Sequence, residues 1–345
     1  MKVDEEKQGI NTYNNHMKEI NSPGEFSEMV NAFRISRIIL TAHELDLFTI
    51  LKDGPLSSPI VAKATGADER ATDRLMNALV PIGLLKKSGS QFSNTDFSIR
   101  FLIKGQPTYM GGLSHYVHLW KTWSTLTEAV KAGTSVAMKH PINERDEDWL
   151  EPFIAAMHSR AIQQAKEIAA VLDLSQTKSV LDIGGGSGAF TFEFIRENPV
   201  ISGTIFDLPN VIPITRRYIS QEGFDKSVTT IAGDYLKDKV GYDYDLVLLS
   251  AVLHINSPDE NRFLIKKCAE ALNPGGQLVI LDHIMTDDRT GPAAGAFFSL
   301  NMLVGTEKGD TYTEKEIKIW MQNAGFKYIR RRDTPQGSNM MIGIK

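Results

Sequence analysis

Residues 180–190 read VLDIGGGSGAF, and the fold that we predict for the chain starts from this stretch. Four glycines, Gly184, Gly185, Gly186 and Gly188, follow apolar residues and one aspartate. The pattern is typical of a buried strand that turns sharply beside a bound cofactor, because glycine permits both the turn and a close approach of the backbone. The glycines alone leave the identity of the cofactor open.

The sequence after residue 179 alternates short apolar segments with helical ones. The apolar segments are nearly continuous runs of β-branched or aliphatic residues, as strands buried on both faces of a parallel sheet are. We therefore predict an α/β fold with a doubly wound parallel sheet. Two segments at the end of the chain can pair as an antiparallel edge. The predicted strands are SVLDI, GTIFD, SVTTIAGD, YDLVLLS and QLVILD, and the edge segments are KYIRRRDT and NMMIGIK.

The chain before residue 106 reads as helices followed by a hairpin. Apolar residues in FRISRIILTAHELDLFTIL recur at helical spacing and predict one buried stripe, formed by Ile35, Ile38, Ile39, Ala42 and Leu45.

Capping signals in the following segment predict two more helices. Ser58 can cap the second helix, Pro59 suits its first position, and Gly66 can end it. Asp68 can cap a third helix, and Ser88-Gly89-Ser90 reads as the turn of a short hairpin.

Three helices followed by a hairpin form a winged-helix arrangement. Such a module often binds DNA by placing its third helix in the major groove. Here the third helix, in DERATDRLMNALVPIGLL, carries as many acids as bases and begins with acids, where base or phosphate contacts would be expected. We therefore favour packing or dimerisation over DNA binding for this part of the chain.

Residues 107–170 continue as helices and include an aromatic-rich segment with Tyr116, Trp120 and Trp123. We interpret these side chains as core packing. The alternative is that some of them line an apolar substrate pocket, because this region leads directly into the glycine-rich strand.

Composition and charge exclude several classes of protein. The 345 residues exceed the usual size of one core, so we expect two domains. With 38 basic and 42 acidic residues, the net charge of -4 gives no general attraction to nucleic acid or to an anionic membrane. The single cysteine, Cys268, excludes an intrachain disulfide and suits a cytoplasmic enzyme. Neither a secretory signal nor an apolar run of about 20 residues is present, so we expect a soluble protein.

Two cofactors fit the glycines. Gly184-x-Gly186-x-x-Ala189 satisfies the dinucleotide pattern, and Asp207 follows at a suitable distance to bind a ribose. A nicotinamide-dependent dehydrogenase is therefore one hypothesis. S-adenosylmethionine, which carries a sulfonium, an ammonium, a ribose diol and an adenine, is the other.

Acids at three successive strand ends favour S-adenosylmethionine. Asp182 can anchor the glycine loop and the amino-acid end of a cationic cofactor, and Asp207 can accept both ribose hydroxyls. Asp234 is placed to bind an exocyclic amine, with Tyr235 beside it to cover an adenine face. A pyrophosphate would prefer fewer negative charges at this edge.

Several motifs together resemble one family. LDIGGGSG, FDLP, AGDY, LVLLSAVLH and LNPGGQLVILD, in this order, resemble class I S-adenosylmethionine-dependent methyltransferases. The similarity is specifically to the O-methyltransferases that include plant caffeate and hydroxyindole enzymes and bacterial polyketide enzymes. SRIILTAHELDLF, LMNALVPIGLLKK and FSNTD resemble the winged-helix dimerisation domain of that family.

The resemblance implies a homodimeric, metal-independent enzyme. It would transfer a methyl group from S-adenosylmethionine to a hydroxyl of an aromatic or quinone-like small molecule. The implied architecture is a flexible or partner-dependent segment 1–27, a winged-helix dimerisation domain 28–106, a helical linker and substrate-pocket region 107–170, and a Rossmann-like catalytic domain 171–345.

His254 is the candidate general base. It follows the fourth predicted strand, where catalytic groups emerge in such sheets, and a histidine with a pKa of about 6.5 can accept a phenolic proton. The resemblance places the family's base at this histidine and a carboxylate partner at Asp282. It also places a glutamate of the plant enzymes at Thr311, which can hydrogen-bond His254 but cannot stabilise an imidazolium as a carboxylate would.

The resemblance also assigns the binding residues. An acceptor pocket would involve Phe153, Met157 and Met302, beside Thr311. The residues implied for the cofactor are Asp182, Gly184, Gly185, Gly186, Asp207, Leu208, Asp234, Tyr235 and Ser250.

Two alternatives to O-methylation stay open at this point. Some members of such families methylate nitrogen or carbon. A winged-helix regulator whose C-terminal domain senses a ligand is the alternative from another class.

Overall fold

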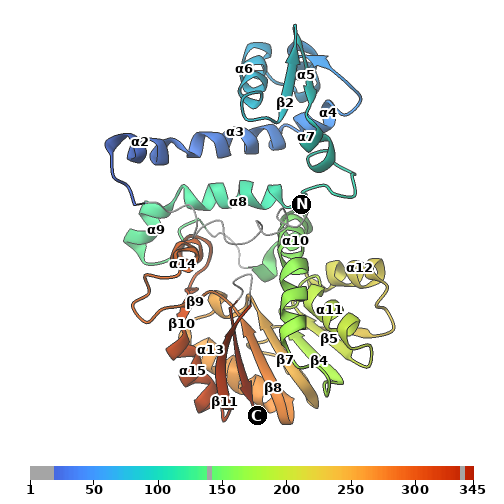
Figure 1. The fold of residues 1–345 in the computed structure, drawn as a ribbon, viewed down its shortest axis with the longest axis vertical. Coiled ribbons are helices and arrows are strands. Elements are labelled where there is room, and N and C mark those ends of the chain that lie inside the picture. Colours follow the sequence, from blue (N-terminus) through green and yellow to red (C-terminus); the bar gives the residue numbers. More distant parts are fainter. Residues whose placement is uncertain (1–18, 138–141, 335–338) are drawn as a thin grey trace, which may run out of the picture. The chain divides into compact units, whose positions relative to one another are not determined.

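A computed structural model describes residues 19–137, 142–334 and 339–345 of the chain. The chain forms two compact units (Figure 1), one from Lys18–Trp120 and the other from Lys121–Lys345. Of the predicted N-terminal segment 1–27, the first 18 residues lie outside the described ones.

The N-terminal unit consists of helices and a small antiparallel sheet, as predicted. Strands β2 and β3 pair as the expected hairpin, with Gly89 in the turn at a φ of +57°. Leu47, Met76 and Phe92 are fully buried in one core. The helices are α2 (Pro23–Asn31), α3 (Phe33–Glu44), α4 (Leu47–Ile50), α5 (Ser58–Thr65), α6 (Glu69–Leu79) and α7 (Asp96–Phe101), with α8 (Leu113–Trp123) at the boundary, and the strands are β1 (Leu56–Ser57), β2 (Leu85–Ser88) and β3 (Gln91–Asn94).

The predicted buried stripe of the first helix is wrong in part. The helical segment breaks at Asp46, whose φ of +54° is incompatible with a continued α-helix, and therefore divides into α3 and α4. Ile35, expected in the stripe, is 54% exposed, whereas Ala42 is buried. Tyr116 is also exposed, so core packing is wrong for this aromatic residue.

The expected caps are confirmed at two of three positions. The side chain of Asp68 accepts the N–H of Ala71 and caps α6, and Gly66 ends α5 with a φ of +67°. Ser58 does not cap α5, because Ser57 is the N-cap residue and the Ser58 hydroxyl donates to Asp73 instead.

The C-terminal unit contains a seven-stranded sheet in the order β11-β12-β8-β7-β4-β5-β6. The strands β4 to β8 in this sheet run parallel, and β12 and β11 add an antiparallel edge, so the predicted sheet and its edge are confirmed. The strands are β4 (Ser179–Ile183), β5 (Ser202–Asp207), β6 (Val228–Ala232), β7 (Tyr244–Ser250), β8 (Leu272–Leu281), β11 (Lys327–Asp333) and β12 (Asn339–Ile344), and a separate parallel pair is β9 (Ile284–Met285) and β10 (Tyr312–Thr313).

Helices cover both faces of the large sheet (Figure 1). α10 and α11 pack on one face, and α13 and α15 pack on the other. The helices of this unit are α9 (Leu126–Ala132), α10 (Glu147–Val171), α11 (Ala189–Glu197), α12 (Ile212–Glu222), α13 (Pro258–Ala271), α14 (Ala293–Gly305) and α15 (Glu314–Asn323), with short 3-10 turns η1 (Ile142–Glu144) and η2 (Leu253–Ile255).

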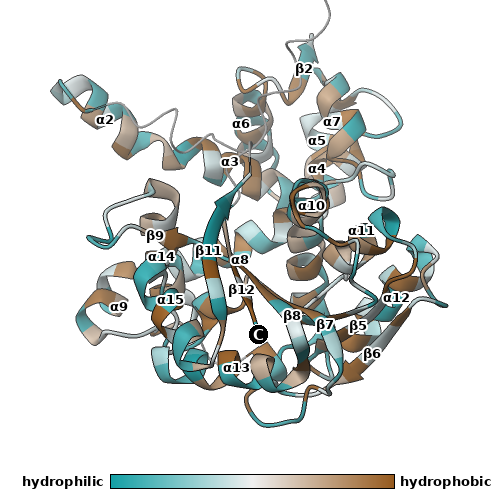
Figure 2. Ribbon diagram, turned by 60° about the horizontal axis from the view of Figure 1, so that its bottom comes forward, coloured by the Kyte–Doolittle hydropathy of each residue, from teal (hydrophilic) through white to brown (hydrophobic). Residues whose placement is uncertain are grey.

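Consecutive residues of the central strand β7 alternate between the two cores. Leu246 and Leu248 lie in the core with α10 and α11, whereas Val247 and Leu249 lie in the core with α13 and α15. The hydropathy of the strands can be followed in Figure 2. Burial on both faces explains why these strands read as continuous apolar runs.

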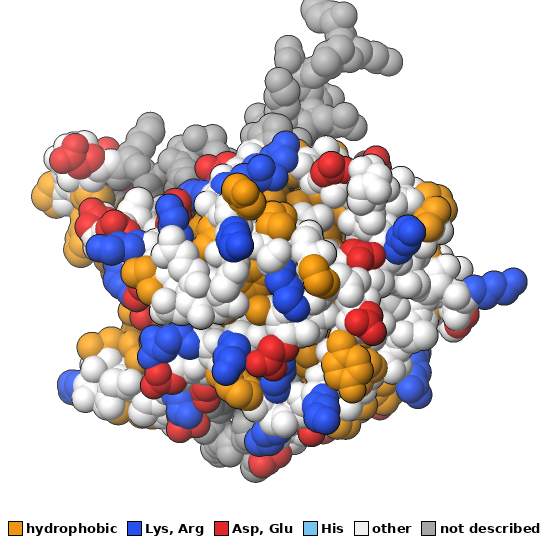
Figure 3. Space-filling model, turned by 90° about the horizontal axis from the view of Figure 1, so that it is seen from below, with side chains coloured by type: hydrophobic (Ala, Val, Ile, Leu, Met, Phe, Trp, Pro, Cys, Tyr) orange, Lys and Arg blue, Asp and Glu red, His pale blue; other side chains and the backbone are white. Residues whose placement is uncertain are grey.

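The face of the molecule in Figure 3 carries basic and acidic side chains that are interspersed with one another. Among the described residues, no helix has the length and apolar character that a membrane span requires.

We predict that Leu248→Ala lowers the free energy of unfolding by about 3 kcal/mol, because Leu248 is fully buried in the central strand and its truncation leaves a cavity. Val200→Ala is the matched control at a position that is 69% exposed, and we expect it to cost less than about 0.5 kcal/mol. Urea unfolding followed by circular dichroism measures both variants. Equal losses would contradict the placement of β7 at the centre of the sheet.

Candidate active site

The glycine loop follows β4 and leads into α11. Gly184, Gly186 and Gly188 have φ values of +69°, +55° and +84°, in the left-handed region that other residues rarely adopt. The N–H of Gly188 donates to the carbonyl of Gly185 at 2.8 Å and closes the turn. The loop therefore requires glycine for its backbone conformation.

Side chains from β5 and α12 hold this loop. The carboxylate of Asp207 accepts the N–H of Gly186 at 2.8 Å and the N–H of Leu208 at 2.7 Å. The hydroxyl of Thr215 in α12 donates to the carbonyl of Gly186 at 2.6 Å. Asp207 thus binds the glycine loop and ends β5 at the same edge of the sheet.

Asp182 lies beneath the loop and is 1% exposed. The Thr191 hydroxyl donates to its Oδ2 at 2.9 Å, whereas its Oδ1 has no hydrogen-bond partner among the described residues. Burial raises the pKa of Asp182 to about 7, against the effect of the Thr191 hydrogen bond and with a further contribution from Asp207. Burial likewise raises the pKa of Asp207 to about 6, although the N–H groups it accepts oppose the rise.

Asp234 and Tyr235 follow β6 at the same edge. The Asp234 carboxylate accepts the N–H of Leu236 and pairs with the ammonium of Lys237, both at 2.9 Å. The Tyr235 hydroxyl donates to Oδ1 of Asn256 at 2.9 Å. Burial raises the pKa of the Tyr235 hydroxyl, so it remains a donor at neutral pH.

His254 and Asp282 form a buried pair. His254 lies in η2 after β7, and its Nδ1 is 2.9 Å from Oδ1 of Asp282, which directly follows β8. The backbone N–H of His254 also donates to Oδ2 of Asp282 at 3.3 Å. Burial acts to raise the pKa of Asp282, but the nearby imidazole of His254 and the hydrogen bonds it accepts hold that pKa below its usual range. The carboxylate is therefore ionised, and the proton of the contact lies on Nδ1.

Two further rings lie next to His254. The Phe298 ring meets the His254 ring edge-on, with centroids 4.8 Å apart and an interplanar angle of 88°. The Phe298 ring also stacks on the ring of His283, with centroids 4.1 Å apart. Burial lowers the pKa of His283 to about 4, so this second histidine is neutral at neutral pH.

Thr311 is buried, and the segment around it contacts His254. The N–H of the preceding residue, Asp310, donates to the carbonyl of His254 at 3.0 Å. Arg289 donates to the carbonyl of Thr311 at 2.7 Å and also binds the carboxylate of Glu316. The contact from this segment to His254 thus runs through the backbone.

The predicted acceptor-pocket residues lie on two helices. Phe153 and Met157 are half-buried on α10, and Met302 is buried on α14. Phe153 and Leu208 pack against the same apolar cluster, which joins α10 to the end of β5. Ser250 ends β7 and is half-buried.

The structure therefore brings the ends of β4, β5, β6, β7 and β8 to one edge of the sheet, because these strands run parallel. This edge carries Asp182, the glycines, Asp207, Asp234, Ser250, His254 and Asp282.

Sequence reasoning did not find two neighbours of the site. The first is Phe298, which lies beside His254, and the second is His158, which contacts Ser187 of the glycine loop. Neither residue belongs to a local sequence pattern that would mark it. Both contacts depend on how distant helices pack, so residue spacing alone could not show them.

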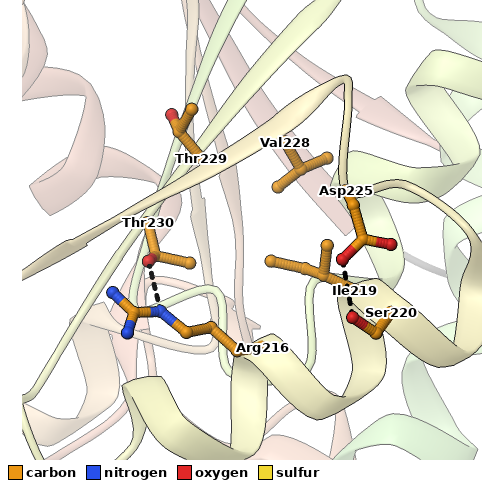
Figure 4. A pocket seen from close by; sticks show the side chains of 7 residues that line it. All are labelled: Arg216, Ile219, Ser220, Asp225, Val228, Thr229 and Thr230. Carbon is orange, nitrogen blue, oxygen red and sulfur yellow. Dashed lines mark hydrogen bonds between the residues drawn. The ribbon is translucent and has the colours of Figure 1, made fainter.

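A cavity of about 390 Å³ lies between α12 and β6 and is lined by none of the predicted site residues (Figure 4). Its polar side chains bind one another, since Arg216 donates to Thr230 and Ser220 donates to Asp225. In the described part of the chain, no group of three or more His, Cys, Asp or Glu side chains is placed to hold a metal ion.

Both units of the chain match known protein families. Residues 123–327 match the O-methyltransferase domain, and residues 27–104 match the O-methyltransferase dimerisation domain. The chain is 31% identical over 333 residues to 3-hydroxy-5-methyl-1-naphthoate 3-O-methyltransferase of Streptomyces sahachiroi. The aligned residues cover 94% of this chain and 95% of the relative.

Solved structures show the same similarity. An O-methyltransferase family protein from Burkholderia thailandensis is 27% identical with a TM-score of 0.84, over 95% of this chain and 99% of the other. Human N-acetylserotonin methyltransferase in complex with SAM is 25% identical with a TM-score of 0.80, over 95% of this chain and 99% of the other.

The fold and the matches thus define a methyltransferase with a Rossmann-like catalytic sheet and a helical dimerisation domain, as predicted. The chain belongs to the O-methyltransferase family. It is an enzyme that uses S-adenosylmethionine as the methyl donor and a hydroxyl group as the acceptor. The comparisons support this function rather than the dehydrogenase, the ligand-sensing regulator, or nitrogen or carbon methylation.

We predict that Asp182 contributes about 1–2 kcal/mol more to the stability of the protein without cofactor near pH 5.5 than near pH 8. Its folded pKa of about 7 lies above the unfolded value of about 3.9, so the folded state binds the extra proton between these values. This stabilisation is complete below the unfolded pKa and is lost as the pH rises through the folded pKa.

Urea unfolding of the wild type and of Asp182→Asn at the two pH values measures this effect. We expect the stability of the wild type relative to Asp182→Asn to fall by this amount from pH 5.5 to pH 8, and its stability relative to the control Asp53→Asn to stay the same, since Asp53 is exposed. An unchanged pH dependence in Asp182→Asn would contradict the raised pKa.

Proposed function

We propose that the enzyme methylates a hydroxyl of an aromatic or quinone-like small molecule, with His254 as the general base and Asp282 as its positioning partner. The observation that carries this proposal is the 2.9 Å contact between His254 Nδ1 and Asp282 Oδ1, at the sheet edge where the glycine loop lies.

The charge of this edge supports the proposed cofactor site. Asp182 and Asp207 are acids without a basic partner in the contacts described above, which favours a cationic cofactor over a pyrophosphate. The unpartnered Oδ1 of Asp182 adds to this negative character. A Cβ at Gly186 would meet only Ile154, at 3.7 Å, so the backbone of Gly186 is accessible to a ligand.

The residues that would hold the cofactor lie at successive strand ends. The glycines Gly184, Gly185 and Gly186, with Asp182, would face its amino-acid end, and Asp207 and Leu208 its ribose. Asp234, Tyr235 and Ser250 would bind the adenosyl part. When bound, S-adenosylmethionine supplies an electrophilic methyl group for transfer to the acceptor oxygen.

The task of His254 is to remove the acceptor proton. A phenol with a pKa of about 10 is mostly protonated at neutral pH, so the oxygen gains nucleophilicity when its proton is removed during attack. Nδ1 of His254 keeps its proton and donates a hydrogen bond to Asp282. Nε2 is therefore the nitrogen that accepts the proton of the acceptor hydroxyl.

Asp282 stabilises the imidazolium that this step forms. It is ionised and its side chain is only 5% exposed, so its charge acts on His254 with little screening by water. Thr311 is neutral, and its segment contacts His254 through the backbone N–H of Asp310. Asp282 therefore carries the electrostatic part of the role that the plant enzymes share between two acids.

The aromatic acceptor is supported by the relatives. Their names give 3-hydroxy-5-methyl-1-naphthoate and N-acetylserotonin as substrates of those enzymes. In this chain Phe153, Met157 and Met302 offer apolar surface for such a ring, and we propose them, with Thr311, as the acceptor pocket.

We also propose a homodimer in the cytoplasm, without a nucleic-acid or membrane partner. The match of residues 27–104 to the dimerisation domain supports the homodimer. Phe26, Met29, Val30 and Phe33 are each roughly half exposed on α2 and α3, and a second copy could bury them. The proposed domains are segment 1–27, the dimerisation domain 28–106, the linker and pocket region 107–170, and the catalytic domain 171–345.

Transfer of labelled methyl from S-adenosylmethionine to a panel of phenols, hydroxyquinones and amines tests the function. We predict label in a hydroxylated aromatic compound and a fall in kcat of about 10²- to 10³-fold in His254→Ala, because a general base contributes on this scale. His43→Gln, a histidine of the N-terminal unit, is the control and is expected to retain activity.

Calorimetry on the same variants should find unchanged binding of S-adenosylmethionine in His254→Ala. Label that appears in an amine, or methyl transfer by His254→Ala at the rate of the wild type, would contradict the role of this histidine.

A further inference from the structure

Ser187 of the glycine loop contacts a residue that the proposed reaction does not use. Its Oγ lies 2.9 Å from Nδ1 of His158 on α10. Ser187 is 6% exposed, so this hydrogen bond is largely shielded from water. The partner, His158, directly follows Met157 in the sequence.

The His158 ring is fixed by a second contact. Its centroid lies 4.3 Å from that of Tyr218 on α12, at an interplanar angle of 40°. Burial lowers the pKa of His158, against a smaller opposite effect of Glu222, so the ring is neutral at neutral pH. A neutral imidazole and a hydroxyl can form the hydrogen bond in either tautomer.

Three elements hold the glycine loop by side chains. Asp207 at the end of β5 and Thr215 on α12 both bind the backbone of Gly186. His158 adds a bond to a side chain of the loop, and it comes from α10. α10 is also the helix that carries the proposed acceptor residues Phe153 and Met157.

A loop with several left-handed glycines gains order from such contacts. Glycine has more backbone freedom than other residues, and freedom that is lost on binding weakens the affinity for a ligand. A contact that orders the loop beforehand removes part of this cost.

We propose that His158 is a positioning residue for the cofactor: through Ser187 it holds the glycine loop against α10 in the conformation that binds S-adenosylmethionine. This inference rests on the proposed function, because it takes the glycine loop as the cofactor site. The pair links the loop to the helix that carries the acceptor residues.

Calorimetric titration with S-adenosylmethionine tests the pair. His158→Phe keeps a ring against Tyr218 but cannot bind Ser187, and Ser187→Ala removes the hydroxyl. We expect each variant to bind about 3- to 10-fold more weakly, as expected for one shielded hydrogen bond. The double variant should bind no more weakly than either single one, because both remove the same bond.

His158→Asn is the conservative variant. The amide of asparagine places a polar atom at the same distance from Cβ as Nδ1 of histidine, so we expect it to restore most of the affinity. A merely structural role would lower the unfolding temperature without changing the affinity, so thermal unfolding without cofactor is measured on every variant. Ser114→Ala is the matched control, since Ser114 forms a 2.9 Å contact with His43 in the N-terminal unit.

Affinities of His158→Phe and Ser187→Ala within 2-fold of the wild type would overturn the inference, as would losses that multiply in the double variant. Gly186→Val separates this outcome from failure of the proposed cofactor site. If Gly186→Val binds normally, the loop is not the cofactor site and the proposed function fails at that point. If Gly186→Val loses binding while His158→Phe retains it, only the role of His158 is lost.

Discussion

The rest of the site depends on the hydrogen bond between the Asp207 carboxylate and the N–H of Gly186. It joins the end of β5 to a turn whose left-handed φ values favour glycine, and it places an acid beside the half-buried backbone of that turn. Asp182 lies beneath the same turn. Two acids with raised pKa values, the buried Asp182 and the half-buried Asp207, are costly for the protein alone, and a cationic ligand would offset that cost.

The register of the sheet determines the distance between base and partner. Ser250 of β7 lies opposite Leu281 of β8 in the parallel pairing. Asp282 follows Leu281 directly, and His254 follows Ser250 in the short turn η2, so the two side chains meet at 2.9 Å. The proposed acid–base chemistry is therefore a consequence of strand pairing, and the flanking rings of Phe298 and His283 restrict the imidazole further.

The sheet and the glycine loop could be predicted from sequence because continuous apolar runs and clustered glycines are local signals. His254 and Asp282 emerged from their places at strand ends together with the family resemblance. Contacts between distant helices left no such signal, and His158 and Ser187 are 29 residues apart. The exposure of Ile35 could not be predicted either, since helical spacing identifies an apolar face but not what covers it.

The most direct measurement is a crystal structure of the protein with S-adenosylhomocysteine, the product of the methyl donor. We predict that the ligand lies against the glycine loop, with its ribose at Asp207 and its sulfur on the side of His254. A ligand bound elsewhere, for example in the cavity between α12 and β6, with Asp207 bonded to the loop alone, would contradict the account.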